Sequence, residues 1–171
     1  TVKVPPPDGP PAAVEPAAAP DRIEHAGLCL PGQHEQLRRA GVTVVSNPAF
    51  LAARGRKYSN ELTAVEREWL YPVRSLLERG VPVAFASDAP VVEPGPLAGV
   101  AAAVRRGDGR VVHAPAEAVT AADALPPATH AAARAMGLAD GRLVAGADAD
   151  LVVLDADPLT TPGDGIAAIE V

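Results

Sequence analysis

From residue 21 onward, short runs of apolar and β-branched residues alternate with segments of helical periodicity. Residues 22–26, 42–46 and 81–86 form three such runs, which predict three strands. The third run is apolar along almost its whole length, which is typical of a parallel strand covered on both faces. The pattern therefore indicates a sheet whose strands are separated by helices.

Helix signals lie between and after these runs. Residues 33–40 predict a polar helix that ends at Gly41, since glycine is favoured just after a helix C-terminus. Thr63 and Glu66 have the spacing of a capping box at the start of a further helical run, which Pro72 divides in two and Gly80 ends. Two more helices are predicted, over residues 97–106 and over 121–136 with an interruption at Pro126-Pro127.

This βαβαβα order predicts an α/β architecture with a parallel sheet. A small doubly wound sheet and part of a barrel both satisfy the pattern. Residues 141–146 and 149–155 predict a glycine-turned hairpin of a small, separate β unit, and the alternation over 166–171 predicts another strand.

The first twenty residues differ in composition from the rest. Seven of the nineteen prolines lie there, namely Pro5, Pro6, Pro7, Pro10, Pro11, Pro16 and Pro20. Proline lacks an amide donor, so this stretch is predicted to be a linker or disordered arm, or alternatively a segment for a proline-binding domain. We expect an arm over 1–20, an α/β unit over 21–138 and a partial β domain over 139–171. Because the chain starts at Thr1 and stops at Val171 inside an apolar run, we expect both ends to be cut.

Composition narrows the possible functions. The net charge of −6 excludes a nucleic-acid binder that relies on bulk positive charge. Hydrophobic residues make up 48% of the chain but aromatic residues only 3%, so the core must consist of Ala, Val and Leu. The single cysteine, Cys29, cannot form an intramolecular disulfide, which favours a cytoplasmic setting and a buried thiol. No apolar run approaches the roughly 20 residues that span a bilayer, so no membrane contact is expected.

Polar residues follow each predicted strand, and they carry the candidate chemistry. His25 ends the first strand, Asn47 follows the second, and Asp88 follows the third. The carboxyl ends of parallel strands share one rim, where ligands of such sheets gather. An imidazole and a carboxylate there can bind a metal ion or transfer protons. A hydrogen-bonded structural histidine and an aspartate that serves as a turn or helix cap are the alternatives.

The other histidines are assigned to structural or surface positions. His34 falls on a polar helix face, His113 in a predicted surface loop, and His130 near a helix start.

Five segments of the chain together resemble the amidohydrolase superfamily, in the branch that includes N-substituted formamide deformylases. They are RIEHA at 22–26, YPVRSLL at 71–77, GVPVA at 80–84, ASDAPV at 86–91, and a tail with GRL at 141–143 and ADLVVLD at 149–155. The resemblance covers about residues 21–171 in the family's order. It implies strands six to eight of a (β/α)8 TIM barrel, followed by strands of a small β-sandwich domain.

The resemblance also implies the chemistry of the site. His25 corresponds to the sixth-strand metal ligand, and Asp88 to the eighth-strand aspartate that binds metal and moves the proton. Asn47 stands where the family often has glutamine, and we expect it to contact substrate. The implied reaction is hydrolysis of a non-peptide carbon–nitrogen bond in a small amide or formamide, with one or two divalent ions, expected to be zinc.

The family's remaining ligands lie on earlier strands than those of this chain. A catalytic zinc normally has three protein ligands, so we expect the chain to be inactive without the missing N-terminal half of the barrel. Its open strand edges also predict self-association. The alternative is a non-catalytic remnant, or a half-barrel interaction module that acts with a partner.

Overall fold

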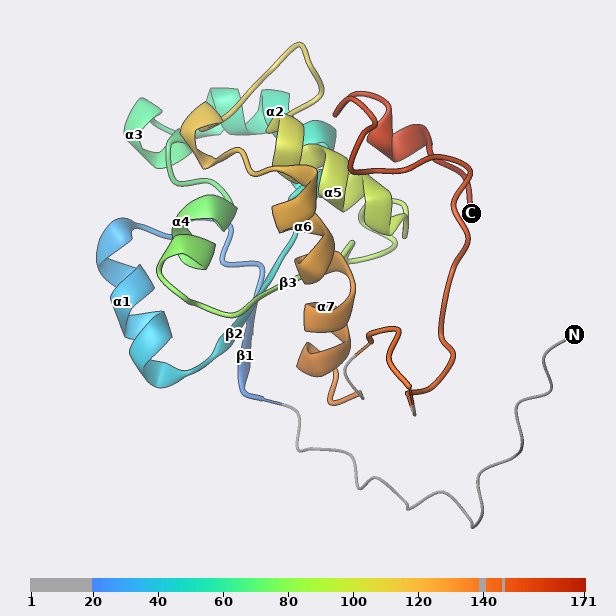
Figure 1. Cartoon of the computed structure of the whole chain (residues 1–171). Helices are drawn as coiled ribbons and strands as arrows, with labels where there is room; N and C mark the ends of the chain where they lie inside the picture. Colours follow the sequence, from blue (N-terminus) through green and yellow to red (C-terminus); the bar gives the residue numbers. More distant parts are fainter. Residues whose placement is uncertain (1–19, 139–140, 146) are drawn as a thin grey trace, which may run out of the picture.

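The computed structural model describes residues 20–138, 141–145 and 147–171. The predicted proline-rich arm therefore lies almost entirely outside the described residues, as does Gly146 of the predicted hairpin. Three strands, β1 (Arg22–Glu24), β2 (Thr43–Ser46) and β3 (Val83–Phe85), form one parallel sheet in the order β1-β2-β3 (Figure 1). The parallel α/β arrangement predicted from the sequence is confirmed, with strands shorter than expected.

The register of the sheet brings the carboxyl ends of the three strands level. Glu24 pairs with Val45, and Ser46 pairs with Phe85. The hydrogen bonding continues one residue beyond each outer strand, since His25 N donates to Val45 O at 2.7 Å and Ala86 N donates to Ser46 O at 2.9 Å. Residues that follow the strands therefore emerge side by side.

Helices connect and cover the strands. They are α1 (Pro31–Ala40), α2 (Ala49–Glu61), α3 (Ala64–Arg67), α4 (Val73–Glu78), α5 (Pro96–Arg105), α6 (Ala121–Ala128) and α7 (His130–Ala135), with 3-10 turns η1 (Pro115–Glu117) and η2 (Ile166–Ala168). The left-handed Gly41 after α1 and the Thr63–Glu66 capping box before α3 are confirmed. Among the described residues, no helix has the length and apolar character needed to cross a membrane.

Two helices differ from the sequence-based expectation. The sequence pattern predicts no helix over 49–61, whereas Pro48 is the N-cap of the 13-residue α2, because proline's fixed φ suits a helix N-terminus. The predicted interruption at Pro126-Pro127 is wrong in position. Both prolines lie inside α6, and the break falls at Thr129, where φ is −125° and ψ is −105°.

The sheet is covered on both faces, as its apolar strands require. On one face, Val44 and Val83 pack with Cys29 and Leu76 beneath α1 and α4. On the other, Val45 and Ala84 pack against Ala135 of α7. Figure 1 shows α1 and α4 on one side of the sheet and α6 and α7 on the other. Because successive strand residues alternate between faces, β2 is buried at every position.

A second core surrounds α5 and consists of small and aliphatic residues, as the composition predicts. Its fully buried members are Val73, Val100, Ala103 and Ala124, together with Ile166 from the C-terminal segment. The strand predicted over 166–171 is wrong, because residues 166–168 form the η2 turn that places Ile166 in this core.

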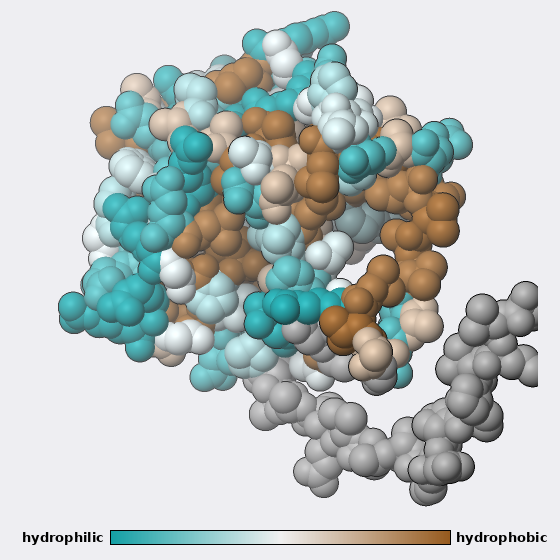
Figure 2. Space-filling model, in the orientation of Figure 1, coloured by the Kyte–Doolittle hydropathy of each residue, from teal (hydrophilic) through white to brown (hydrophobic). Residues whose placement is uncertain are grey.

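The hairpin predicted over 141–155 is absent from the described part of that segment. Residues 141–145 and 147–155 contain no strand. Leu143, Val144, Leu151 and Val153 are each at least 60% exposed, and Figure 2 shows a hydrophobic arm that stands away from the main body. Two strands with no third strand or helix to cover them are marginal in water, which accounts for the difference.

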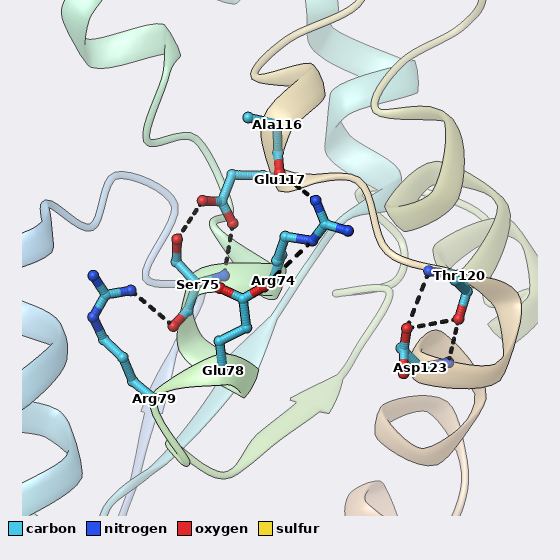
Figure 3. A network of polar contacts seen from close by, with 8 residues as sticks. All are labelled: Arg74, Ser75, Glu78, Arg79, Ala116, Glu117, Thr120 and Asp123. Atoms are coloured by element: carbon cyan, nitrogen blue, oxygen red, sulfur yellow. Dashed lines mark hydrogen bonds and ion pairs between the residues drawn. The ribbon is translucent and has the colours of Figure 1, made fainter.

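A buried carboxylate joins η1 to the start of α4. Both carboxylate oxygens of Glu117 accept from Ser75, one from its backbone N at 2.9 Å and the other from its Oγ at 2.5 Å (Figure 3). Arg74 donates to the carbonyl of Ala116 and forms an exposed ion pair with Glu78. Since the first turn of α4 has no acidic residue of its own, Glu117 supplies the negative charge that a helix N-terminus favours.

A buried arginine fastens the loop before α4 to the end of α5. Arg106 has no exposed surface, and its guanidinium donates to the carbonyls of Leu70, Tyr71 and His113. Burial lowers its pKa to about 10, with the negative charge of Glu117 acting in the opposite direction.

We predict that Arg106→Met destabilises the chain by about 3 kcal/mol or more, because the substitution leaves three buried carbonyls unpaired. Urea unfolding followed by circular dichroism measures the loss. Arg110→Met, at an exposed position, is the matched control and should change stability by less than about 0.5 kcal/mol. Equal effects of the two substitutions would contradict the role assigned to Arg106.

Candidate functional site

Two of the residues expected at the functional rim have left-handed backbones. His25 has φ of 68° and Asp88 has φ of 57°. This region is uncommon for residues other than glycine, and such conformations concentrate at functional sites. His25 directly follows β1, Asp88 lies three residues beyond the end of β3, and both are exposed. The left-handed turn ends β1 and redirects the chain at His25.

The three strand ends are joined by the side-chain amide of Asn47. Its Oδ1 lies 2.7 Å from Nδ1 of His25, which follows β1. Its Nδ2 donates to the carbonyl of Ala86, which follows β3, at 2.9 Å. Asn47 is only 1% exposed, so the amide makes these bonds away from competing water. The expected substrate contact of Asn47 stays a prediction, and here both ends of the amide bind protein atoms.

One ring nitrogen of the exposed His25 has no partner among the described residues. Its imidazole stacks beside the Phe50 ring, with centroids 6.3 Å apart and an interplanar angle of 24°. Nδ1 is taken by Asn47, and no hydrogen bond within the described residues engages Nε2. An exposed imidazole held at one nitrogen and open at the other has the form of a metal ligand.

Asp88 lies beyond the end of β3 in a turn that its own backbone closes. Its carbonyl accepts from Val91 N at 2.8 Å, which agrees with the structural reading of this aspartate as a turn residue. Its carboxylate, however, forms no hydrogen bond or ion pair with the residues that the structure describes. The backbone makes the turn, and the carboxylate is left for another partner.

An aromatic cluster missed by the sequence analysis adjoins these residues. Phe50 lies edge-on to Tyr71, with centroids 6.2 Å apart, and the hydroxyls of Tyr71 and Tyr58 are 3.1 Å apart. Burial, followed by the hydrogen bond with Tyr58, raises the pKa of Tyr71 far above its usual range, and the negative charge of Asp88 adds to this. The chain has only two Tyr and two Phe, and three of these four side chains gather here. The low number of Phe and Tyr residues was the only feature of the sequence that could have pointed to this cluster.

His25 and Asp88 fit part of a metal site. Imidazole nitrogen and carboxylate oxygen are both zinc ligands, and one of each is open to solvent at the rim. In the ranges that the structure describes, no group of three or more His, Cys, Asp or Glu side chains is placed to hold an ion. Within the described residues, His25 and Asp88 alone would therefore not complete a coordination shell.

Two other histidines are buried, contrary to expectation. His34 has no exposed surface, its Nε2 lies 3.0 Å from Cys29 O, and its ring meets the edge of Trp69. His113 is 4% exposed, with Nε2 2.9 Å from Gly55 O. The carbonyl partner of His34 lies only five residues earlier in the chain, whereas that of His113 comes from α2, 58 residues away.

Cys29 is buried as predicted, and burial raises the pKa of its thiol. We predict that iodoacetamide alkylates Cys29 in the native chain at pH 8 at least about ten-fold more slowly than in the urea-unfolded chain, because the thiolate is the nucleophile. Mass spectrometry of timed samples measures both rates. Alkylation at one common rate would show that the thiol is accessible in the native state.

The fold and the rim together define a class: a parallel α/β unit with polar residues at the carboxyl ends of its strands. Comparison with known proteins identifies that class more closely. The model of the amidohydrolase family matches residues 9–171, so the chain belongs to the amidohydrolase family of hydrolases.

Individual relatives agree with this assignment. The chain is 36% identical over 146 residues to the N-substituted formamide deformylase of Arthrobacter pascens, covering 81% of this chain and 26% of that protein. Its structure resembles the crystal structure of an uncharacterized metal-dependent hydrolase from Pyrococcus horikoshii OT3, with a TM-score of 0.75 and 30% identity, covering 84% of this chain and 30% of that one. A similar hydrolase from Pyrococcus furiosus gives a TM-score of 0.70 and 29% identity, covering 81% and 28%. The chain thus spans less than a third of the length of these relatives, and their likeness supports a fold related to the TIM barrel.

Proposed function

We propose that the chain forms the carboxyl-end part of a metal-dependent hydrolase that cleaves non-peptide carbon–nitrogen bonds in small amides or formamides. Its three strands would be strands six, seven and eight of the barrel. The observation that carries the proposal is His25, whose Nδ1 is held by Asn47 and whose Nε2 is open at the strand ends. The likeness to the formamide deformylase supports the substrate class, and the likeness to metal-dependent hydrolases supports the metal.

In this proposal, His25 and Asp88 have different roles in metal binding and proton transfer. His25 would hold the ion through Nε2, and Asp88 through a carboxylate oxygen. A bound divalent ion, in our proposal one or two zinc ions, would polarise the substrate carbonyl and lower the pKa of the attacking water towards about 7. The Asp88 carboxylate takes a proton from the attacking water and delivers it to the departing nitrogen, a role that suits an exposed carboxylate with no competing partner in the described structure.

The remaining metal ligands would come from the missing N-terminal half of the barrel. β1 is exposed at all three of its positions, so its outer edge is open to a further strand. The exposed apolar residues between Leu143 and Val153 are a second surface for that half. Without it, we expect the chain to be inactive and to self-associate. These same surfaces favour the second candidate function, a non-catalytic half-barrel that binds a partner.

Substitutions in the complete hydrolase, made with its N-terminal half, test the proposal. His25→Gln and Asp88→Asn should each lower the bound metal content and reduce kcat/KM on an N-substituted formamide by at least about 100-fold. Metal analysis and steady-state kinetics measure the two effects.

His130→Gln is the matched control. His130 borders a groove of about 490 Å³ that also contains Thr43 and Val81, at the amino ends of the strands and so away from the rim. Unchanged metal content and turnover in both rim variants would refute the proposed site. Loss in all three variants would indicate general damage to the fold rather than loss of a ligand.

A further inference from the structure

The orientation of the Asn47 amide follows from the atoms that surround it. The carbonyl of Ala86 can only accept a hydrogen bond, so the end of the amide beside it must be the donor Nδ2. Oδ1, which can only accept, is thereby turned toward Nδ1 of His25. The partner of Oδ1 must in turn be a donor, so the proton of the neutral imidazole lies on Nδ1.

A proton on Nδ1 leaves Nε2 with a free lone pair. Only an unprotonated ring nitrogen can bind a metal ion, and the partner of the other nitrogen decides which nitrogen that is. If the proton were on Nε2, it would point to the open side of the ring, and Nδ1 and Oδ1 would face each other at 2.7 Å as two acceptors. The observed geometry selects the form that leaves Nε2 open.

The surroundings of His25 restrict the ring as well as its proton. Phe50 lies along one face, and the backbone amide of His25 donates to Val45 O of the central strand, which ends one residue before Asn47. Burial of Asn47 strengthens its two hydrogen bonds, because water does not compete for them.

We propose that Asn47 is a positioning residue: it holds His25 as the Nδ1–H tautomer, so that Nε2 is directed outward as an electron-pair donor. The use of Nε2 for a metal rests on the proposed function, whereas the tautomer itself does not. Asn47 thus acts through His25, and this role uses both ends of the amide that was expected to contact substrate.

The chain contains internal standards for a test. Nε2 of His34 and Nε2 of His113 each face a backbone carbonyl, so both residues must carry the proton on Nε2, opposite to His25. His34 Nδ1 is buried, and no described acceptor is placed to receive a proton from it, in agreement with a proton on Nε2. One spectrum can therefore compare the two tautomers in the same molecule.

The experiment is long-range proton–nitrogen NMR of the 15N-labelled full chain at about pH 8.5, well above the ordinary histidine pKa of about 6.5. We expect a protonated Nδ1 for His25 and a protonated Nε2 for both buried histidines. Asn47→Leu should shift His25 toward the Nε2–H form and leave His34 and His113 unchanged, which also shows that the fold persists. Asn60→Leu, the same substitution at an exposed position of α2, should change none of them.

Asn47→Asp separates the hydrogen bond from a general effect on folding. Its carboxylate can still accept from Nδ1–H but cannot donate to Ala86, so we expect the His25 tautomer to be retained even if stability falls. Loss of the Nδ1–H form in this variant while His34 and His113 are unchanged would contradict the proposal. The Nε2–H form of His25 in the unsubstituted chain would overturn it directly.

Titration with Zn²⁺, followed at the His25 Nε2 resonance, distinguishes the inference from the proposed function. Apparent affinity should fall about 10- to 100-fold in Asn47→Leu and remain unchanged in Asn60→Leu. If the Nδ1–H tautomer is present but Zn²⁺ does not affect Nε2 in the unsubstituted chain, the metal site is refuted and the tautomer assignment stands. Equal Zn²⁺ affinities in the two leucine variants would refute the positioning role.

Discussion

The amide of Asn47 is the side-chain contact that ties the two outer strand ends of the rim together, in addition to the backbone hydrogen bonds of His25 and Ala86. Asn47 lies directly after the central strand of the sheet, and its amide binds a ring nitrogen beyond β1 and a carbonyl beyond β3. A parallel sheet fixes the register of its strands but not the paths of the chain beyond them. Because one buried side chain holds both outer strand ends, the left-handed turn at His25 has a fixed partner, and the imidazole has a defined direction.

The packing of the sheet and its helices holds the strand that precedes Asn47 in place. β2 is buried throughout, with α4 and α7 packed against opposite faces of the sheet. Arg106 donates to the carbonyls of Leu70 and Tyr71. The Tyr71 ring in turn contacts the Phe50 ring that flanks His25. Buried polar groups thus position the connections, while small aliphatic side chains fill the core.

The strands, their parallel order and the residues that follow them could be predicted from the sequence, because apolar runs and turn signals are local. The predictions of His25, Asn47 and Asp88 at one rim followed from that topology. The contacts of the Asn47 amide could not be foreseen, since they depend on register across three strands. The burial of His113 was missed for a similar reason, because its partner Gly55 O lies 58 residues away, and that of His34 because the ring packs against the distant Trp69. In the 141–155 segment the sequence predicted an element that the described residues do not form, because local strand preference alone does not make a sheet.

We propose that, among the described residues, those at the rim bind the metal ion. Adding substoichiometric Mn²⁺ to the 15N-labelled chain tests this proposal, since a paramagnetic ion broadens the amide resonances nearest to it. We expect the amides of His25, Asn47 and Asp88 to broaden first. Broadening centred instead on the exposed acidic residues Asp148, Asp150 and Asp155 of the C-terminal segment, with the rim unaffected, would contradict it.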